Sequence, residues 1–560
     1  MKLNKKSLRW FARWTGRHLM FILFLAAMLL RLLLLRFRFA VSFDESHYLR
    51  LAGSFFSQGL SGLLHPYWPP LFPMLIAAAK PFTGNLEWAG HLLNATAGSL
   101  LVVLVYRLAL ELVDRREAVL SAFIVAFHPA LAFMSTDVMP ETTYALLGIG
   151  GMLTGWKAFH RKSWLLSGLA GALWGLAYLA KPEATGFPMV YAILLILFWK
   201  RARNKPDRLT WAARLAVLCI GFAIVAAPYL VYLRQATGTW TLSTKGMVNQ
   251  QMEAVVLLGA GDTADPFFHL TADNRHLPYD MAYHSGDLQD LLKRREGRER
   301  VIRLNPVDYA VKFMKNFYRV ERNAVPSLFT LVLLVSCALG FFSPIFGRER
   351  RKGWLYCIAF IAFYWFLLIP FFHVNERYFI PLLPVALIWS GRGLFVLKGW
   401  IVRYAFDRRK RSMTAWVLLS VWGAAFFAIP EAAKVLSVRP SNPDMWAQPV
   451  EMKEAGLWLK NFTGHPPILM SLNKSVDFYA GQVDIRKGAS FSYDSVERNV
   501  AYARLRGVEY MVFSSRYLGW FPNLRPLFDA EIPTPFLDRI YDRTRPEGVR
   551  TVIFRVTPHG

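Results

Sequence analysis

The chain has few cysteines and few charged residues for its length. Only three of its 560 residues are cysteine, and Cys219, Cys337 and Cys357 all lie within apolar runs. A disulfide framework is therefore excluded, and no cysteine spacing suits a metal site. Charged residues make up 19% of the chain and hydrophobic residues 54%, a composition typical of a polytopic membrane protein and not of a soluble enzyme.

Acidic residues are especially scarce, with 38 Asp and Glu against 66 Lys and Arg. The net charge of +28 would suit a nucleic-acid partner, but the basic residues cluster in short segments between apolar runs. Such connections mark the cytoplasmic side of membrane proteins, and none is interleaved with base-stacking aromatics in a soluble module, so we expect no nucleic-acid partner. The segments are KLNKK, DRRE, HRK, KRARNK, GRERRK and RRKRS.

Apolar runs long enough to cross a membrane recur as far as about residue 437. Because a helix of roughly 17 to 25 residues spans about 30 Å of hydrocarbon, we predict a polytopic α-helical membrane protein with about 11 transmembrane helices. With a cytoplasmic N-terminus, this number places every basic segment in the cytoplasm and the C-terminus outside. The predicted spans are 19–40, 86–112, 117–134, 141–159, 163–180, 184–200, 211–233, 325–346, 353–372, 378–396 and 413–437.

The segment HPYWPPLFPMLIAAAKPF, residues 65–82, is apolar enough to suggest a further crossing. Counting it as a span would move DRRE and every later basic segment to the wrong side of the membrane. Its prolines suit a re-entrant or interfacial segment that packs against protein. We therefore predict that it stays on the outer face.

The chain divides into a transmembrane domain, residues 1–437, and a soluble extracytoplasmic domain, residues 438–560. The first has two larger outer loops, about 41–85 and 234–322. The second lacks long apolar runs, so we predict a small C-terminal α/β domain. It begins with a helix, PVEMKEAGLWLKNF, followed by the strand-like pieces PPILMSL, SVDFYA, GVEYMVFSS and VRTVIFRV.

Ionisable residues gather at the outer ends of the predicted spans. Such groups at membrane depth cost free energy unless they are paired or functional, so some of them should form a site. Their positions also allow structural roles, since acids favour the start of a helix and long cations at helix ends reach toward water. They are Asp44, Glu45, His47, Tyr48, His65, Asp137, Glu141, Lys181, Glu183, Arg234, His373, Glu376 and Arg377.

Five stretches of sequence carry a resemblance to a known family. In chain order they read FDESHYLRLA, YWPPLFPMLIA, FHPALAFMSTDVMPETTYALL, GLAYLAKPEATGFP and ERYFIPLLPVALI. Together they resemble the GT-C superfamily of polyprenyl-phosphate-sugar-dependent glycosyltransferases, in its bacterial branch related to protein O-mannosyltransferases and aminoarabinose transferases. The likeness covers nearly the whole chain and implies a GT-C-like fold.

The resemblance implies roles for residues on the outer face. It makes Asp44 the catalytic base and Glu45 its support. It makes Arg377 and Lys181, with Tyr48, the binding groups for the donor phosphate. Asp137 and Glu141 would position the acceptor or hold a divalent metal ion, the one cofactor considered. His65 is a further acceptor or metal candidate, although without an H-x-x-x-H spacing a hydrogen-bonded structural role fits it better.

Chemistry supports this choice of residue types. A sugar on a polyprenyl phosphate already has a good leaving group, so the enzyme must activate an acceptor hydroxyl and stabilise the departing phosphate. The outer loop TGTWTLSTKGMVNQQ also resembles a family loop and could line the acceptor entrance. One departure is Tyr67-Trp68-Pro69-Pro70, because aminoarabinose transferases carry an acid and a lysine before the paired prolines.

We therefore expect an inverting glycosyltransferase of the bacterial cytoplasmic (inner) membrane. Its partners would be a polyprenyl-phosphate-linked sugar donor, an envelope lipid, glycan or protein acceptor, and membrane lipid. Two alternatives remain open. A transporter or flippase would carry charges within its spans. A polysaccharide ligase or polymerase using a polyprenyl-diphosphate glycan would favour several arginines in the large outer loop, where LKRREGRERVIR lies.

Overall fold

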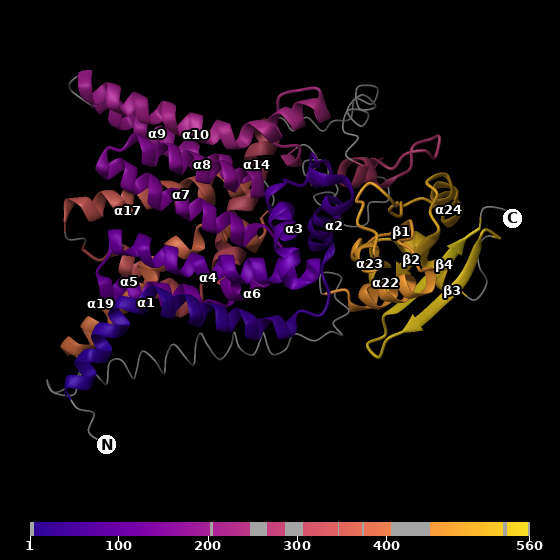
Figure 1. Cartoon of the computed structure of the whole chain (residues 1–560), viewed down its shortest axis with the longest axis horizontal. Coiled ribbons are helices and arrows are strands. Elements are labelled where there is room, and N and C mark those ends of the chain that lie inside the picture. The colour runs from indigo at the N-terminus through magenta and orange to yellow at the C-terminus, as the bar shows by residue number, and fades with distance from the viewer. Residues whose placement is uncertain are drawn as a thin grey trace.

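The structure is a computed structural model, and it describes residues 5–201, 205–246, 266–285, 306–344, 347–371, 374–404, 448–529 and 535–557. The predicted span 413–437 and His373 lie outside the described residues. A bundle of roughly parallel helices occupies one side of the molecule, and a small domain with a sheet occupies the other (Figure 1).

The bundle confirms a helical membrane protein. Its helices are α1 (Lys5–Leu34), α4 (Leu86–Leu112), α5 (Arg115–Phe127), α6 (Pro129–Met134), α7 (Glu141–Arg161), α8 (Trp164–Ala180), α9 (Gly186–Arg201), α10 (Lys205–Thr237), α16 (Leu331–Phe342), α17 (Arg348–Ile361) and α19 (Leu383–Tyr404). Large apolar side chains point outward from them, including Phe21, Leu29 and Ile224, which are 60 to 70% exposed. Lipid is the solvent that such a surface requires.

Fewer of the described helices than the predicted eleven or so are both long enough and apolar enough to cross a membrane. Within the described residues four helices satisfy both, and a bent pair raises the number to five. Several predicted spans are helical but short or broken. The predicted span 117–134 ends as α5 at Phe127 and restarts as α6 at Pro129, because proline fits the first turn of a new helix. The count of eleven stays a prediction.

Two helices within residues 41–85 lie between the bundle and the small domain (Figure 1). They are α2 (Phe43–Gln58) and α3 (Leu71–Thr83). α3 ends at Gly84, whose left-handed conformation (φ 80°) stops the helix. Its 13 residues are too few to cross about 30 Å of hydrocarbon, which is consistent with an outer segment and not a further span.

The C-terminal domain is a four-stranded sheet with helices. Its elements are α22 (Val450–Thr463), β1 (Leu469–Ser471), α23 (Ser475–Tyr479), α24 (Val496–Leu505), β2 (Tyr510–Ser514), β3 (Leu537–Thr544) and β4 (Arg550–Val556). The strand order is β1-β2-β4-β3; β1 and β2 are parallel, whereas β4 is antiparallel to both of its neighbours. The predicted helix and three of the predicted strands are present.

One prediction in this domain is wrong, and one strand was not predicted. The piece SVDFYA forms the helix α23, because Asn473 accepts a hydrogen bond from the Ser475 amide (3.0 Å) and turns the chain at that point. The edge strand β3 was missed because its sequence, LDRIYDRT, is largely polar and half-exposed. Charged residues are typical of sheet edges, where they prevent pairing with other chains.

Candidate active site

The paired acids at the start of α2, Asp44 and Glu45, have different hydrogen-bond partners. Glu45 is buried, and its carboxylate accepts hydrogen bonds from the Ser42 amide (2.5 Å) and the Val138 amide (2.7 Å). The first bond completes a capping box at the helix start, and the second ties α2 to the loop before α7. Glu45 therefore supports the local backbone, while Asp44 is left to point elsewhere.

Asp44 forms an ion pair with Arg377. A guanidinium nitrogen of Arg377 donates to Oδ2 of Asp44 at 2.7 Å, and the two side chains are 34% and 28% exposed respectively. Burial raises the pKa of Asp44, but the positive charge and hydrogen bond of Arg377, with smaller contributions from His47 and Lys245, outweigh it and leave the pKa below its ordinary value. Asp44 is thus an ionised carboxylate that solvent can reach.

A second pair lies beside the first. Lys181 directly follows α8, and Glu141 is the first residue of α7. The ammonium of Lys181 lies 3.1 Å from Oε1 of Glu141 and 4.0 Å from the carboxylate of Glu183. Nε of Arg377 is 3.8 Å from the same Glu141 oxygen. The structure therefore brings together Asp44, Glu141, Lys181 and Arg377, four residues predicted from separate loops, and we call them the site cluster.

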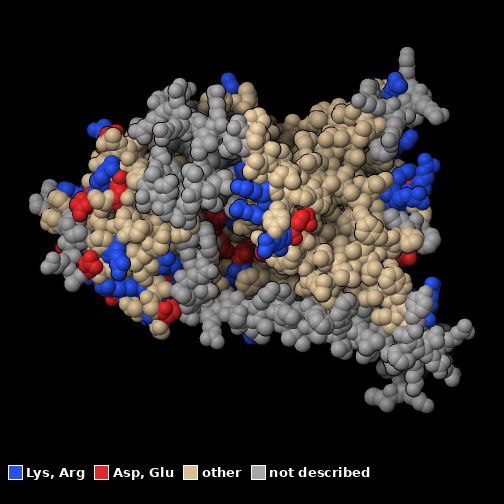
Figure 2. Space-filling view, turned by 180° about the vertical axis from the view of Figure 1, so that it is seen from behind, with Lys and Arg blue, Asp and Glu red and all other residues tan. Residues whose placement is uncertain are grey.

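The site cluster keeps hydrogen-bonding capacity. Oε2 of Glu141, Oε2 of Glu183 and Nε of Arg377 are buried without a hydrogen-bond partner. Unsatisfied buried polar atoms cost about 1–3 kcal/mol each, so a native fold rarely leaves them without a reason. Figure 2 shows a hollow between the helical region and the C-terminal domain, with acidic and basic side chains at its edge.

Lys245 is a cation of this site that sequence reasoning missed. It lies in the loop after α10, above the rings of Tyr67 and Trp68 at 5.3 and 5.5 Å. Burial lowers its pKa, and Glu183, Asp44 and Glu141 are close enough to oppose that effect. The loop is held in place because Thr244 donates to the carbonyl of Pro66 (2.7 Å). The one available signal was a single charge in the polar loop TGTWTLSTKGMVNQQ.

Tyr48 lines the wall of this site. Its side chain is 2% exposed and packs edge-on against Trp68 and Phe72, with ring centroids 5.1 and 5.4 Å apart. Burial raises the pKa of its phenol, and the nearby charges of Glu141 and Asp44 add to the effect. The phenol is therefore neutral. Phosphate binding by Tyr48 stays a prediction.

His65 has a structural arrangement. Its Nδ1 accepts from the amides of Tyr67 (3.1 Å) and Trp68 (3.4 Å), so its Nε2 carries the proton and donates to the carbonyl of His284 (3.3 Å). Burial lowers the pKa of His65 to about 3. A neutral ring with both nitrogens engaged has no lone pair to offer a metal ion or an acceptor.

Asp137 pairs with a residue outside the site cluster. Its carboxylate forms an ion pair with Arg38. Its main-chain carbonyl accepts a hydrogen bond from the side-chain amide of Asn94 (2.6 Å). Burial raises the pKa of Asp137 to about 7, with Glu45 and Glu141 adding to the effect and Arg38 opposing it. No group of three or more His, Cys, Asp or Glu side chains within the described part of the chain could hold a metal ion.

The C-terminal domain fixes α2 from its other side. Arg50 is fully buried and donates to the carbonyls of Gln482 (3.0 Å), Asp484 (2.7 Å) and Lys487 (3.1 Å). One turn further along α2, a Cβ on Gly53 would lie 2.5 Å from a methyl group of Val483, so only glycine allows this close approach. The helix that carries Asp44 is therefore held by contacts with the C-terminal domain.

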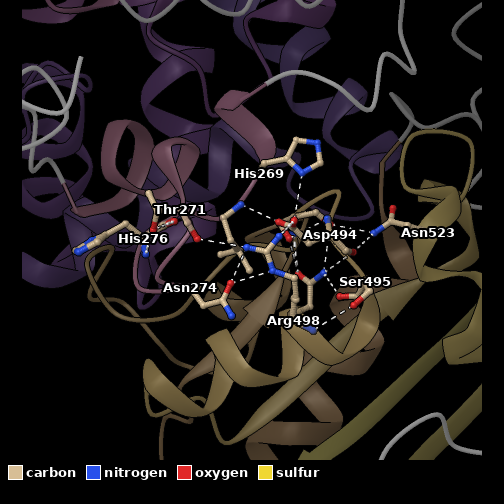
Figure 3. A network of polar contacts seen from close by, with 11 residues as sticks. His269, Thr271, Asn274, His276, Asp494, Ser495, Arg498 and Asn523 are labelled. Atoms are coloured by element: carbon tan, nitrogen blue, oxygen red, sulfur yellow. Dashed lines mark hydrogen bonds and ion pairs between the residues drawn. The ribbon is translucent and has the colours of Figure 1, made fainter. Parts of the chain in front are cut away.

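Residues 266–285 connect the same two parts. Asp494 accepts from the amide of Leu270 (2.7 Å), and Arg498 donates to the side chain of Asn274 (2.7 Å) (Figure 3). Nearer the site, Nε2 of His47 lies 3.3 Å from Nδ1 of His284. This segment thus joins the N-terminal part of α2 to the C-terminal domain.

Comparisons with known proteins agree with this architecture. A family model described as dolichyl-phosphate-mannose-protein mannosyltransferase matches residues 65–232. No curated protein matches the chain in a sequence comparison. Several solved structures share its fold.

The similar structures come from an archaeon and a bacterium. The oligosaccharyltransferase of Archaeoglobus fulgidus, solved with Zn and sulfate, is 13% identical, with a TM-score of 0.54 over 95% of this chain and 73% of that one. The oligosaccharyltransferase AglB of the same organism, in complex with an inhibitory peptide and a dolichol-phosphate, is also 13% identical, with a TM-score of 0.53 over 96% and 74%. ArnT from Cupriavidus metallidurans, bound to undecaprenyl phosphate, is 13% identical, with a TM-score of 0.50 over 96% and 98%.

Proposed function

The chain has the fold of the GT-C glycosyltransferases, as the sequence resemblance predicted, and from this premise we propose that it is an inverting glycosyltransferase. It moves one sugar from a polyprenyl-phosphate donor to an acceptor hydroxyl. The observation that carries the proposal is the solvent-accessible ion pair of Asp44 and Arg377 beside Lys181 and Glu141. A base and phosphate-binding cations are the groups that this reaction requires.

Asp44 acts as the general base. The acceptor oxygen attacks the anomeric carbon from the face opposite the phosphate, so the configuration inverts. Its proton passes to the Asp44 carboxylate, and the bond from the anomeric carbon to the phosphate oxygen breaks. The electron pair of that bond leaves with the polyprenyl phosphate.

Arg377 links donor binding to the strength of the base. In the structure its positive charge lowers the pKa of Asp44 and makes this carboxylate a weak base. When a donor phosphate binds Arg377, the phosphate neutralises that charge, and the pKa of Asp44 rises. A planar guanidinium suits this exchange because it binds carboxylate and phosphate with the same geometry.

The charge balance favours a single phosphate. Three cations, Arg377, Lys181 and Lys245, share the described site with the carboxylates of Asp44, Glu141 and Glu183. Because these three positive charges are matched in number by three negative ones, no excess positive charge is left for the larger charge of a diphosphate. The arginine-rich stretch LKRREGRERVIR of the ligase alternative lies outside the described residues.

The location of basic side chains supports a site on the outer face. Figure 2 shows Lys and Arg at the end of the bundle remote from the C-terminal domain. There, α17 begins with the basic sequence RERRK. By the positive-inside rule such an end faces the cytoplasm, and this supports our proposal that the site cluster and the C-terminal domain lie outside the cytoplasmic membrane of a bacterium.

The test is mass spectrometry of envelope lipids, glycans and glycoproteins from cells that express either the wild type or Asp44→Asn at equal levels. Asp538→Asn, an exposed carboxylate on β3, is the matched control. We expect Asp44→Asn to lose one sugar increment and to accumulate its polyprenyl-phosphate donor, while the control matches the wild type. An envelope that Asp44→Asn leaves unchanged, with donor and acceptor both detected, would contradict the proposal.

A further inference from the structure

One helix of the large outer loop crosses the direction of the bundle. α14 (Pro306–Arg319) continues through the turn Val320–Ala324 into α15 (Val325–Leu328). This continuous stretch is bent by 106° from α16. If α16 crosses the membrane, α14 therefore lies nearly parallel to the membrane surface. Figure 1 places α14 at the end of the bundle where α3 lies.

α14 exposes an apolar stripe. Val307, Val311, Met314 and Tyr318 are spaced four, three and four residues apart and are 67, 48, 62 and 57% exposed. This spacing places them on one face of a helix. Water is an unfavourable environment for four such side chains in a row, whereas the acyl boundary of a bilayer is a favourable one.

A basic cavity adjoins this stripe. It measures about 320 Å³ and is lined by Lys315, Tyr318, Arg319, Arg322 and Asn323. Arg322 donates to the hydroxyl of Tyr318 (2.7 Å), which orients its guanidinium toward the stripe. Among the residues that the structure describes, neither Lys315 nor Arg319 forms an ion pair. The cavity therefore presents positive charge without a negative partner.

The buried face of α14 is tied to the segment that leads to Arg377. Asn316 donates to the carbonyl of Pro370 (3.0 Å), and the rings of Phe313 and Phe371 lie 5.0 Å apart. These contacts leave the stripe and the cavity facing away from the bundle. A partner for them must come from outside the described chain.

We infer that α14 is an interfacial helix whose cavity binds the phosphate of an anionic phospholipid headgroup. The apolar stripe enters the acyl boundary, and the row Lys315, Arg319 and Arg322 meets the headgroup layer just above it. Charge complementarity selects an anionic lipid, since a zwitterionic headgroup leaves the cavity charge uncompensated. A phospholipid and not the sugar donor is the occupant, because the cavity shares no residue with the site cluster.

The test uses the full chain with p-benzoylphenylalanine in place of Tyr318, reconstituted in vesicles of phosphatidylglycerol and phosphatidylcholine at one to four. After irradiation, mass spectrometry measures the share of each lipid among the adducts. We expect phosphatidylglycerol adducts at several times their mole fraction. Lys315→Gln with Arg319→Gln should return the share to the mole fraction, whereas Arg348→Gln with Arg351→Gln, at the start of α17, should not.

Three outcomes would overturn the inference. Lipid adducts in proportion to their mole fractions in the otherwise unchanged protein would show no selective site. An absence of lipid adducts would show that α14 does not lie at the bilayer. Preferential crosslinking to undecaprenyl phosphate, when this lipid is added to the vesicles, would assign the cavity to the polyprenyl carrier instead of a phospholipid.

Discussion

α2 carries two arrangements of charge, and they differ in exposure to solvent. Arg50 and Asp477 are 0% exposed and lie 3.7 Å apart, and the guanidinium also binds three main-chain carbonyls of the C-terminal domain. In the site cluster, Asp44 and Arg377 remain partly exposed, at 28% and 34%. The first arrangement serves the fold, whereas the second keeps capacity for a ligand.

The largest effect on activity should come from substituting Asp44, the solvent-accessible carboxylate of the site cluster. Because general-base catalysis contributes about 10²–10⁴-fold, we expect Asp44→Asn to reduce kcat by about that factor. The near-isosteric amide should leave thermal unfolding of the purified protein unchanged. Steady-state transfer assays and a melting curve on the same sample separate the two effects, and a variant that retains most of its kcat would exclude Asp44 as the base.

Substituting Arg50, in the buried pair with Asp477, should instead reduce the stability of the fold. Arg50→Met leaves Asp477 as an unpaired buried charge, which typically costs about 3–5 kcal/mol of folding stability. We expect earlier thermal unfolding and faster proteolysis at the contact between α2 and the C-terminal domain. The exposed residue Arg275 provides the control, since Arg275→Met should change stability by less than about 0.5 kcal/mol.

An Arg50→Met protein that melts like the wild type would show that this contact is not needed for the fold. An intermediate result is also informative. If the folded fraction keeps the wild-type KM but loses kcat, Arg50 positions Asp44 in addition to stabilising the domain contact.

A pH profile tests the coupling of Arg377 to Asp44. In the wild type, Arg377 holds the pKa of Asp44 below its ordinary value, so the acid limb of kcat/KM should lie at a lower pH than the limb of an ordinary aspartate. Arg377→Gln removes the largest effect that lowers this pKa and leaves burial, which raises it. We expect the limb to move to higher pH in Arg377→Gln, and to move less in Arg377→Lys. An unmoved limb would show that Asp44 is not the titrating group.

The smallest effect concerns Lys245. Its ammonium adds charge at the rim without forming a short ion pair in the described part of the chain, so it should contribute mainly to donor binding. We expect Lys245→Gln to raise the KM for the donor about tenfold, equivalent to 1.4 kcal/mol, with a smaller change in kcat. Lys245→Arg should stay near the wild type. Equal losses in both variants would favour a packing role over a charge role.

The sequence predicted the site cluster better than the buried contacts of Arg50. Asp44, Glu141, Lys181 and Arg377 were predicted to converge because one rule, the placement of basic segments in the cytoplasm, puts all of them on one side of the membrane. Arg50 and Lys245 were missed, since their partners lie far away in the sequence and no local pattern indicates them. Glu45 was assigned to the site as a support, and the structure shows that its hydrogen bonds go to the backbone.

The contact of Arg50 with Lys487 bridges 437 residues of sequence, and this separation has a consequence for biogenesis. At about 5–20 residues per second, a ribosome needs roughly 20 to 90 s to make the intervening chain. During that time α2 has emerged, but the carbonyls that receive Arg50 do not yet exist. The helix that carries Asp44 thus gains these contacts only when most of the protein has been made, so a chain released early by the ribosome would carry α2 without them.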